Sequence, residues 1–192
     1  IPIVRHLAKL LLKYLRWWDQ VAIHRPDIII PLSQLVFERA INSYNAQISK
    51  PLYPPVDAIE LQTNDDLLAH FNLPTNFNLV VSRLVFYKRI DLTIKACCQL
   101  NQNLVIVGEG TEREKLQQLA KKLSTSSSSK IIFLSSQPQE IVNSLMKNAS
   151  LFLSVGVDDF GLAPLQANLF GTPAIINSQS GVTEIYKKIE LG

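Results

Sequence analysis

From residue 79 onward, short apolar runs alternate with segments in which apolar residues recur every three or four positions. The runs predict buried β-strands, and the segments between them predict helices of about ten residues. The predicted strands are 79–83, 103–107, 130–134, 150–154 and 173–177. The predicted helices lie near 90–100, 111–123, 138–148, 161–170 and 182–189. Apolar strands that alternate with helices favour a parallel sheet covered on both faces. We therefore expect an α/β fold with a doubly wound, Rossmann-like parallel sheet.

The chain before residue 79 has a different pattern. Residues 25–45 (RPDIIIPLSQLVFERAINSYN) predict a short strand and then a helix capped by Ser33, as in the last unit of a preceding Rossmann-like domain. Residues 50–57 (KPLYPPVD) contain consecutive prolines, which favour an extended and stiff connector. We therefore predict three parts: the end of an N-terminal domain (1–56), an interdomain linker (57–77) and a C-terminal domain (78–192).

Residues 4–24 predict an amphipathic helix. One face carries basic side chains and the opposite face carries apolar ones. These are Arg5, Lys9, Lys13 and Arg16 on the basic face, and Leu7, Leu11, Tyr14 and Trp18 on the apolar face. Two interpretations stay open: the apolar face packs on a domain core, which we favour because surface helices are amphipathic by default, or residues 4–18 lie on an anionic membrane surface.

Composition narrows the class of protein. The 192 residues are 47% hydrophobic, which is enough for a globular core, and a net charge of +3 gives no reason to expect a nucleic acid partner. No apolar run approaches the ~20 residues of a membrane span, and the first residues do not have the pattern of a signal peptide. We expect a cytoplasmic protein, peripheral to the inner face of the plasma membrane if the basic helix binds lipid. The first residue is not methionine and the chain stops just after a helical pattern, so we also expect a fragment.

Cysteines and histidines do not suggest a metal site. Cys97 and Cys98 are adjacent on a predicted helix, where they cannot form a disulfide with each other without strain. His6, His24 and His70 are scattered along the chain. We expect the cysteines to fill the core, and we expect no metal cofactor.

The loops that follow the predicted strands share one edge of the sheet, where such folds bind ligands. Arg83, Lys88 and Arg89 follow the first strand, a GEG sequence (108–110) follows the second, and GVDDFG (156–161) follows the fourth. Cations and helix N-termini suit a phosphate group, and carboxylates suit sugar hydroxyls. The combination indicates a nucleotide sugar.

Two simpler interpretations apply to parts of this set. Asp159 has the pattern of a cap for a helix that begins near Gly161, with Pro164 in its first turn. The GEGTER sequence (108–113) has Arg113 where a dinucleotide fingerprint has its third glycine, so we exclude a nicotinamide cofactor.

Four segments together resemble one enzyme family. They are YPPVD (53–57), VVSRLVFYKRIDLTIKA (80–96), LVIVGEGTEREKLQQLA (104–120) and the long segment from IIFLSSQPQE to LFGTPAII (131–176). They resemble the family-4 retaining glycosyltransferases with the GT-B fold (glycosyl transferases group 1), and the similarity runs from about Leu15 to the end. The resemblance implies two Rossmann-like domains across a cleft, with the nucleotide sugar on the C-terminal domain and the acceptor mainly on the other. Compared with that family, most of the N-terminal domain and the usual C-terminal tail are missing, so we expect the fragment to be inactive alone.

The resemblance also implies roles for individual residues. Arg83 and Lys88 match the pair that grips the donor diphosphate, and Asp158 matches the first acid of the family's E-x7-E motif, which contacts the transferred sugar. Gln166 matches the second acid, which usually binds the ribose, and Glu184 matches a frequent acid after a loop of small residues. The segment from Phe160 to Leu162 matches the family segment whose backbone amides face the sugar and the phosphate. The expected donor-binding residues are Arg83, Lys88, Gly108, Asp158, Phe160, Gly161, Leu162, Gln166 and Glu184, and the expected catalytic ones are Arg83, Lys88 and Asp158.

The chain departs from the motif at both acids. Asp158 keeps the charge with a shorter reach, whereas Gln166 keeps an acceptor oxygen and loses the charge. We expect a hexosyltransferase, with mannose suggested by SRLVFYKRIDL (82–92), that uses a nucleotide diphosphate sugar and a glycan or lipid-linked acceptor in polysaccharide biosynthesis. A non-catalytic nucleotide-sugar-binding paralogue and a GT-B sugar-nucleotide epimerase are the alternatives.

Overall fold

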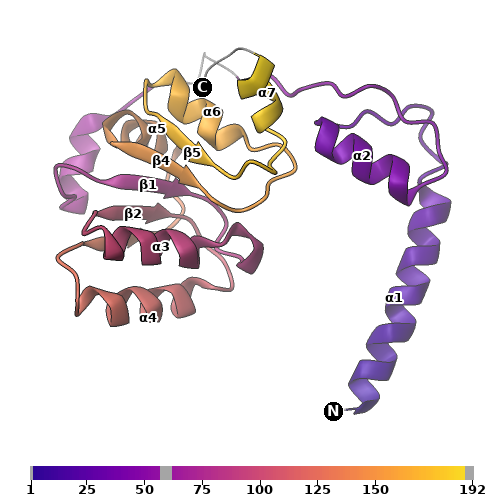
Figure 1. Ribbon diagram of the computed structural model, residues 1–192, viewed down its shortest axis with the longest axis horizontal. Coiled ribbons are helices and arrows are strands. Elements are labelled where there is room, and N and C mark those ends of the chain that lie inside the picture. Colours follow the sequence, from indigo (N-terminus) through magenta and orange to yellow (C-terminus); the bar gives the residue numbers. More distant parts are fainter. Residues whose placement is uncertain (1, 57–61, 189–192) are drawn as a thin grey trace. The chain divides into compact units, whose positions relative to one another are not determined.

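The computed structural model describes residues 2–56 and 62–188, and the chain divides into two compact units, Ile1–Pro54 and Pro55–Gly192. The first unit contains α1 (Pro2–Ala22) and α2 (Gln34–Ser43), which Figure 1 shows. Ser33 caps α2 as predicted, because its Oγ accepts a hydrogen bond from the Val36 amide at 3.1 Å. The strand predicted before this helix is reduced to one parallel bridge between Ile29 and Ile48, because a single paired residue forms no ladder.

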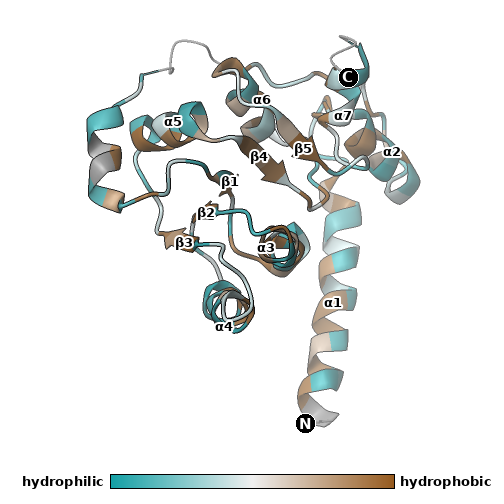
Figure 2. Ribbon diagram, turned by 60° about the vertical axis from the view of Figure 1, so that its left-hand side comes forward, coloured by the Kyte–Doolittle hydropathy of each residue, from teal (hydrophilic) through white to brown (hydrophobic). Residues whose placement is uncertain are grey.

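The apolar face of α1 is exposed. Figure 2 shows apolar and polar residues mixed along this helix, and its residues 4–21 are all exposed, with Leu7 at 62%. At its C-terminal end, the Tyr44 hydroxyl donates a hydrogen bond to Asp19 Oδ2 at 2.6 Å, and this bond raises the pKa of Tyr44. The described part of the chain thus does not bury the face that we expected to pack on a domain core. None of the described helices has the length and apolar character needed to cross a membrane.

The second unit is built around a five-stranded parallel sheet. Its strands are β1 (Asn78–Val81), β2 (Leu104–Val107), β3 (Ile131–Leu134), β4 (Leu151–Ser154) and β5 (Ala174–Ile176). Their order in the sheet is β3-β2-β1-β4-β5, and every pair is parallel. The chain therefore winds outward from β1 to β3 and then crosses back to β4, which is the doubly wound arrangement that the apolar runs predicted.

Helices cover both faces of this sheet (Figure 1). They are α3 (Ile90–Gln99), α4 (Arg113–Ser124), α5 (Gln139–Asn148) and α6 (Leu162–Leu169), and α7 (Thr183–Lys188) follows β5. One core cluster joins Ile94 and Leu116 of α3 and α4 to Ile106 of the sheet. The other joins Leu145 of α5 to Phe152 of the sheet. Odd and even strand positions serve opposite faces, so two apolar layers form on one sheet.

Cys97 and Cys98 are free and buried in the cluster under α3, as predicted for small core residues. Burial raises the pKa of the Cys97 thiol. A thiol with a raised pKa is less ionised and therefore less reactive at neutral pH.

A 3₁₀ helix at Asp65–Phe71, which the sequence did not predict, packs against α5. Lys147 Nζ lies 2.7 Å from Asp65 Oδ2 and lowers the pKa of that carboxyl, and the Asn64 amide donates to Ser144 Oγ at 2.7 Å. Residues 57–61 of the predicted linker lie outside the described residues. The rest of that linker belongs to the second unit, and the division into 1–56, 57–77 and 78–192 stays a proposal.

Candidate functional site

The loops after β1 and β4 form a pocket at the carboxyl edge of the sheet, where the strand order reverses. We call it the β1–β4 pocket. Its volume is about 280 Å³, and its charged lining residues are Arg83, Lys88, Asp158 and Asp159. Ligands of doubly wound folds bind at this reversal point, because the loops on its two sides turn away from each other and leave a crevice.

A second pocket adjoins the first, because Val81, Ser82 and Arg83 line both. We call it the β1–β3 pocket, and its volume is about 540 Å³. Its other walls come from the loops after β2 and β3 and from the helices α5 and α6. The lining residues from these elements include Gly108, Glu109, Gln137, Val142, Met146 and Gln166. Arg83 therefore lies where the charged β1–β4 pocket meets the larger and less charged β1–β3 pocket.

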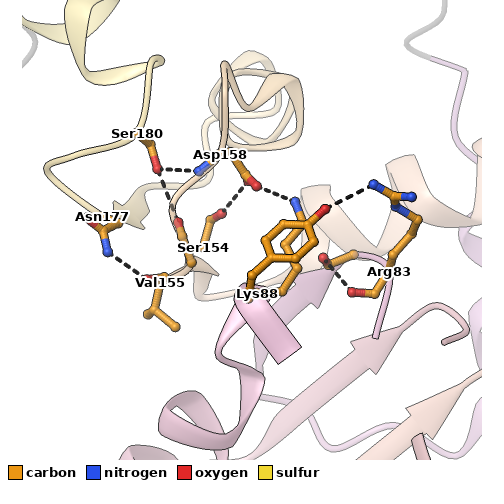
Figure 3. A network of polar contacts seen from close by, with 10 residues as sticks. Arg83, Lys88, Ser154, Val155, Asp158, Asn177 and Ser180 are labelled. Carbon is orange, nitrogen blue, oxygen red and sulfur yellow. Dashed lines mark hydrogen bonds and ion pairs between the residues drawn. The ribbon is translucent and has the colours of Figure 1, made fainter. Parts of the chain in front are cut away.

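Lys88 and Asp158 form a salt bridge inside the β1–β4 pocket, between Lys88 Nζ and Asp158 Oδ1 (Figure 3). Their side chains are 19% and 14% exposed, so the pair is largely shielded from water. Ser154 Oγ donates a longer hydrogen bond, 3.5 Å, to Asp158 Oδ2. The sequence predicted both residues for one site but not their contact. A ligand that binds Lys88 therefore meets the carboxylate of Asp158 as well.

The loop that carries Asp158 is held by the loop after β5. Ser180 Oγ accepts a hydrogen bond from the Asp158 amide and donates one to the Gly156 carbonyl, both at 3.1 Å (Figure 3). The Gly181 amide donates to the Asp158 carbonyl at 3.0 Å. The loop after the fifth strand was expected at this edge with the others, but Ser180 was not predicted as a site residue. Its hydroxyl fixes the backbone on both sides of Val157, and hence the position of the Asp158 carboxylate.

Arg83 is exposed and stays outside the Lys88–Asp158 pair. Its Nη2 donates a hydrogen bond to the Tyr87 hydroxyl at 3.0 Å. No carboxylate in the described part of the chain forms a salt bridge with its guanidinium. A guanidinium has five N–H donors in a planar fork, so the remaining donors suit an oxyanion.

Gly156 brings the two sides of the pocket into backbone contact. A Cβ at this position would lie 2.6 Å from Lys88 Cα and 2.7 Å from the Tyr87 carbonyl oxygen. Both atoms belong to the backbone and cannot move aside as a flexible side chain does. Gly156 was not predicted as a site residue, although a glycine two residues after the end of an apolar strand was an available signal.

Gly108 has the same function between the loops after β1 and β2. Its φ is 140°, and a Cβ there would lie 2.0 Å from the Ser82 carbonyl oxygen. Arg113, which replaces the third glycine of a dinucleotide fingerprint, donates hydrogen bonds to the carbonyls of Gly108 at 2.8 Å and Leu134 at 3.3 Å. Arg113 thus ties together the loops that line the β1–β3 pocket.

The segment 160–162 connects the pocket to α6. Phe160 is buried, Gly161 is the N-cap residue with a φ of 100°, and Leu162 is the first residue of the helix. The N-cap position is therefore Gly161 and not Asp159, because the backbone turns into the helix only after a left-handed residue. All three residues line the β1–β4 pocket, as does Asp159.

Two predicted residues lie apart from both pockets. Glu184 is in α7 and lines neither the β1–β4 nor the β1–β3 pocket. Arg89, which the sequence grouped with the other cations, forms a salt bridge with Asp91 at 3.1 Å. The structure therefore brings together Arg83, Lys88, Gly108, Asp158, Gln166 and residues 160–162 around two adjoining pockets, and it separates Glu184 and Arg89 from them.

The family model of the glycosyl transferases group 1 matches residues 69–192, which include both pockets. The chain belongs to this family. Membership agrees with the resemblance carried by residues 80–96, 104–120 and 131–176, which all lie within the match. The match also covers the 3₁₀ helix at Asp65–Phe71 from residue 69 onward.

Two curated relatives match part of this chain. An uncharacterized glycosyltransferase of Methanocaldococcus jannaschii is 32% identical over 114 residues, which are 57% of this chain and 29% of the relative. A GDP-mannose-dependent alpha-(1-6)-phosphatidylinositol dimannoside mannosyltransferase of Mycobacterium tuberculosis is 34% identical over 123 residues, 60% of this chain and 31% of the relative. The matched stretch spans less than a third of the length of these relatives.

Solved structures support the fold. HepE of Anabaena, crystallised with UDP and glucose, aligns with a TM-score of 0.75 at 21% identity, over 89% of this chain and 50% of that one. Sucrose-phosphate synthase of Thermosynechococcus elongatus gives a TM-score of 0.70 at 19% identity, over 90% of this chain and 46% of that one. The predicted GT-B-like α/β fold is confirmed.

Proposed function

We propose that this chain forms the donor-binding part of a retaining glycosyltransferase that moves a hexose from a nucleotide diphosphate sugar to a glycan or lipid-linked acceptor. The observation that carries the proposal is the junction of the two pockets at Arg83. The β1–β4 pocket supplies two cations and two carboxylates. The β1–β3 pocket supplies apolar side chains, backbone, the carboxylate of Glu109 and three side-chain amides, one of them from Gln166. A nucleotide sugar has matching parts in the same order: sugar, diphosphate and nucleoside.

The donor diphosphate would lie against Arg83 and Lys88. Negative charge develops on the leaving nucleoside diphosphate while the sugar becomes cationic, so fixed cations at the phosphates lower the barrier. Arg83 offers a forked guanidinium and Lys88 a compact charge. Since these two side chains supply the positive charge at the leaving group, we propose transfer that does not depend on a divalent metal.

The transferred hexose would lie beside Asp158 and the backbone amides of 160–162. The bond from the anomeric carbon to the phosphate oxygen breaks, and its electron pair stays on the diphosphate. The acceptor hydroxyl oxygen bonds to the same face of that carbon, and its proton passes to a donor phosphate oxygen. In this account the protein provides no covalent nucleophile, and Asp158 stabilises positive charge on the sugar.

The nucleoside would occupy the β1–β3 pocket, with Gln166 accepting a ribose hydroxyl and Met146 and Val142 near the base. Gly108, which lines this pocket, allows the loops after β1 and β2 to approach closely at its edge. Glu184 stays a prediction from the family resemblance. The mycobacterial relative is named as GDP-mannose-dependent and HepE was solved with UDP, so both nucleotides belong in any test.

A screen of nucleotide sugars tests the proposed activity. Intact protein would be incubated with GDP-mannose, UDP-glucose and related donors in the presence of membrane and glycan extracts, and release of the nucleoside diphosphate would be measured. We expect release that depends on the acceptor, with a glycosylated product. Binding without release would support the non-catalytic paralogue, for which the loss of charge at Gln166 is the specific reason, and conversion of the donor sugar without acceptor would support an epimerase.

Gln166→Glu is expected to tighten donor binding or leave it unchanged. A carboxylate accepts hydrogen bonds from ribose hydroxyls more strongly than an amide does, by about 1–2 kcal/mol at most. Isothermal titration with UDP and GDP measures the effect. A clear loss of affinity would mean that the neutral side chain is adapted to a different ligand, and it would favour the non-catalytic paralogue.

Residues 1–56 would form the end of the acceptor-side domain in this proposal. The exposed apolar residues of α1 need a partner, and the favoured one is the remainder of that domain. Contact of residues 4–18 with an anionic membrane stays the alternative, and the nature of the acceptor stays a prediction.

A further inference from the structure

Tyr87 contacts both cations of the proposed diphosphate site. Its hydroxyl accepts a hydrogen bond from Arg83 Nη2 at 3.0 Å, and Lys88 Nζ lies 5.6 Å from the centre of its ring. Tyr87 also lines the β1–β4 pocket together with the two cations. One aromatic side chain thus contacts the two positive groups by two different interactions, a hydrogen bond to the guanidinium and a cation–π contact to the ammonium.

The local backbone explains how one residue reaches both. Tyr87 is in the middle of a single 3₁₀ turn, Phe86–Lys88, which is closed by a hydrogen bond from the Lys88 amide to the Val85 carbonyl at 3.1 Å. Arg89 follows in a left-handed conformation with φ at 51° and ends the turn. The turn places Lys88 next to the ring, and the ring extends back towards Arg83, four residues earlier.

The core does not require this tyrosine. Tyr87 is 39% exposed and belongs to neither of the two core clusters. Its ring packs edge to face on Phe86, with centroids 6.0 Å apart, and Phe86 is itself 77% exposed. Replacement of Tyr87 therefore removes contacts at the pocket and leaves the apolar layers of the sheet unchanged.

We propose that Tyr87 is a positioning residue that holds Arg83 and Lys88 in place for the donor diphosphate. This proposal rests on the proposed function, because the ligand is the diphosphate of the donor. An exposed arginine samples many rotamers, and ordering it at the moment of binding costs affinity. The Tyr87 hydroxyl accepts a hydrogen bond from one N–H of the Arg83 guanidinium and leaves the other N–H groups available for an anion. The face of the Tyr87 ring holds the Lys88 ammonium next to Asp158.

Two substitutions separate the two interactions. Tyr87→Phe keeps the ring and its contact with Lys88 but removes the acceptor for Arg83. Tyr87→Leu removes both. We expect Tyr87→Phe to weaken binding of UDP or GDP by about two- to tenfold, in line with one hydrogen bond, and Tyr87→Leu to weaken it further. Tyr186→Phe is the matched control: it deletes a hydroxyl that bonds to Asn168 outside both pockets, and nucleotide affinity should stay unchanged.

The decisive experiment is a double-mutant cycle measured by isothermal titration of the intact protein with UDP and GDP. Tyr87→Phe should weaken binding when Arg83 is present and have no further effect in Arg83→Ala, because the hydroxyl acts through that residue. The positioning role would be overturned if Tyr87→Phe weakened binding equally with Arg83 present and in Arg83→Ala, or if it had no effect on binding in either protein. If Arg83→Ala weakens binding and Tyr87→Phe does not, only the role of Tyr87 fails. If the wild-type protein binds neither nucleotide, both the role of Tyr87 and the proposed function fail.

Discussion

Asp158→Asn is expected to lower the rate of sugar transfer by about 10²–10³-fold, the range for removal of one preorganised electrostatic group from an active site. The carboxylate faces the proposed sugar site and pairs with Lys88. Its loss removes the negative charge that would stabilise the cationic sugar and frees Lys88 for the diphosphate. We therefore expect kcat to fall while the affinity for UDP or GDP stays the same or rises, as measured by steady-state kinetics and isothermal titration.

Asp159→Asn is the matched control for this result. Asp159 lines the same pocket but is not assigned to the sugar, so its conversion should leave turnover nearly intact. Loss of the salt bridge in Asp158→Asn leaves Lys88 without its partner and costs about 1–3 kcal/mol of unfolding free energy, so thermal melting is compared for both variants. Equal activity in the two variants would contradict the role given to Asp158.

Gly156→Ala is expected to abolish detectable transfer and to destabilise the second unit by about 1–3 kcal/mol, the usual range for overpacking. The added Cβ would lie 2.6 Å from Lys88 Cα, so the loops after β1 and β4 must separate. Their separation displaces both Lys88 and Asp158. Thermal melting of the intact protein measures the loss of stability, and acceptor-dependent release of the nucleoside diphosphate measures the loss of transfer. The affinity for UDP and GDP reports the damage to the donor site.

Gly171→Ala separates instability from damage to the site. Gly171 has a φ of 80°, so alanine is strained there, but no atom lies within 4 Å of the added Cβ and the residue lines neither site pocket. We expect a stability loss of about 1 kcal/mol or slightly more with unchanged nucleotide affinity. Normal affinity in Gly156→Ala would show that the close approach of the two loops does not shape the donor site.

Elements with a strong apolar signal were predictable from the sequence. The five strands were predicted with bounds within two residues of those observed, because each is a short buried run between turn-forming residues. The 3₁₀ helix at Asp65–Phe71 was missed, because its stability depends on tertiary contacts such as that between Asp65 and Lys147. The strand predicted before α2 is a single bridge, because an apolar run becomes a strand only where a neighbour pairs with it.

The residues of the site were predictable from the sequence, but their contacts with one another were not. Parallel strands place their carboxyl ends at one edge, and this rule was sufficient to group Arg83, Lys88 and Asp158. The salt bridge between the last two depends on β1 and β4 being neighbours, and strand order is not encoded in the pattern of any single strand. The functions of Gly156 and Ser180 depend on interatomic distances across loops, which no local sequence pattern specifies.

The central claim is that the two pockets hold a nucleoside diphosphate with its phosphates at Arg83. Isothermal titration of the intact protein with UDP, GDP, UMP and GMP tests it most directly. We expect one diphosphate to bind at least about tenfold more tightly than the monophosphate of the same base, since the added phosphate gains charge-assisted hydrogen bonds. We expect Arg83→Ala to reduce this difference clearly, with Lys88 as the remaining cation at the phosphates. Equal affinities for diphosphate and monophosphate, or no saturable binding of either diphosphate, would contradict the account.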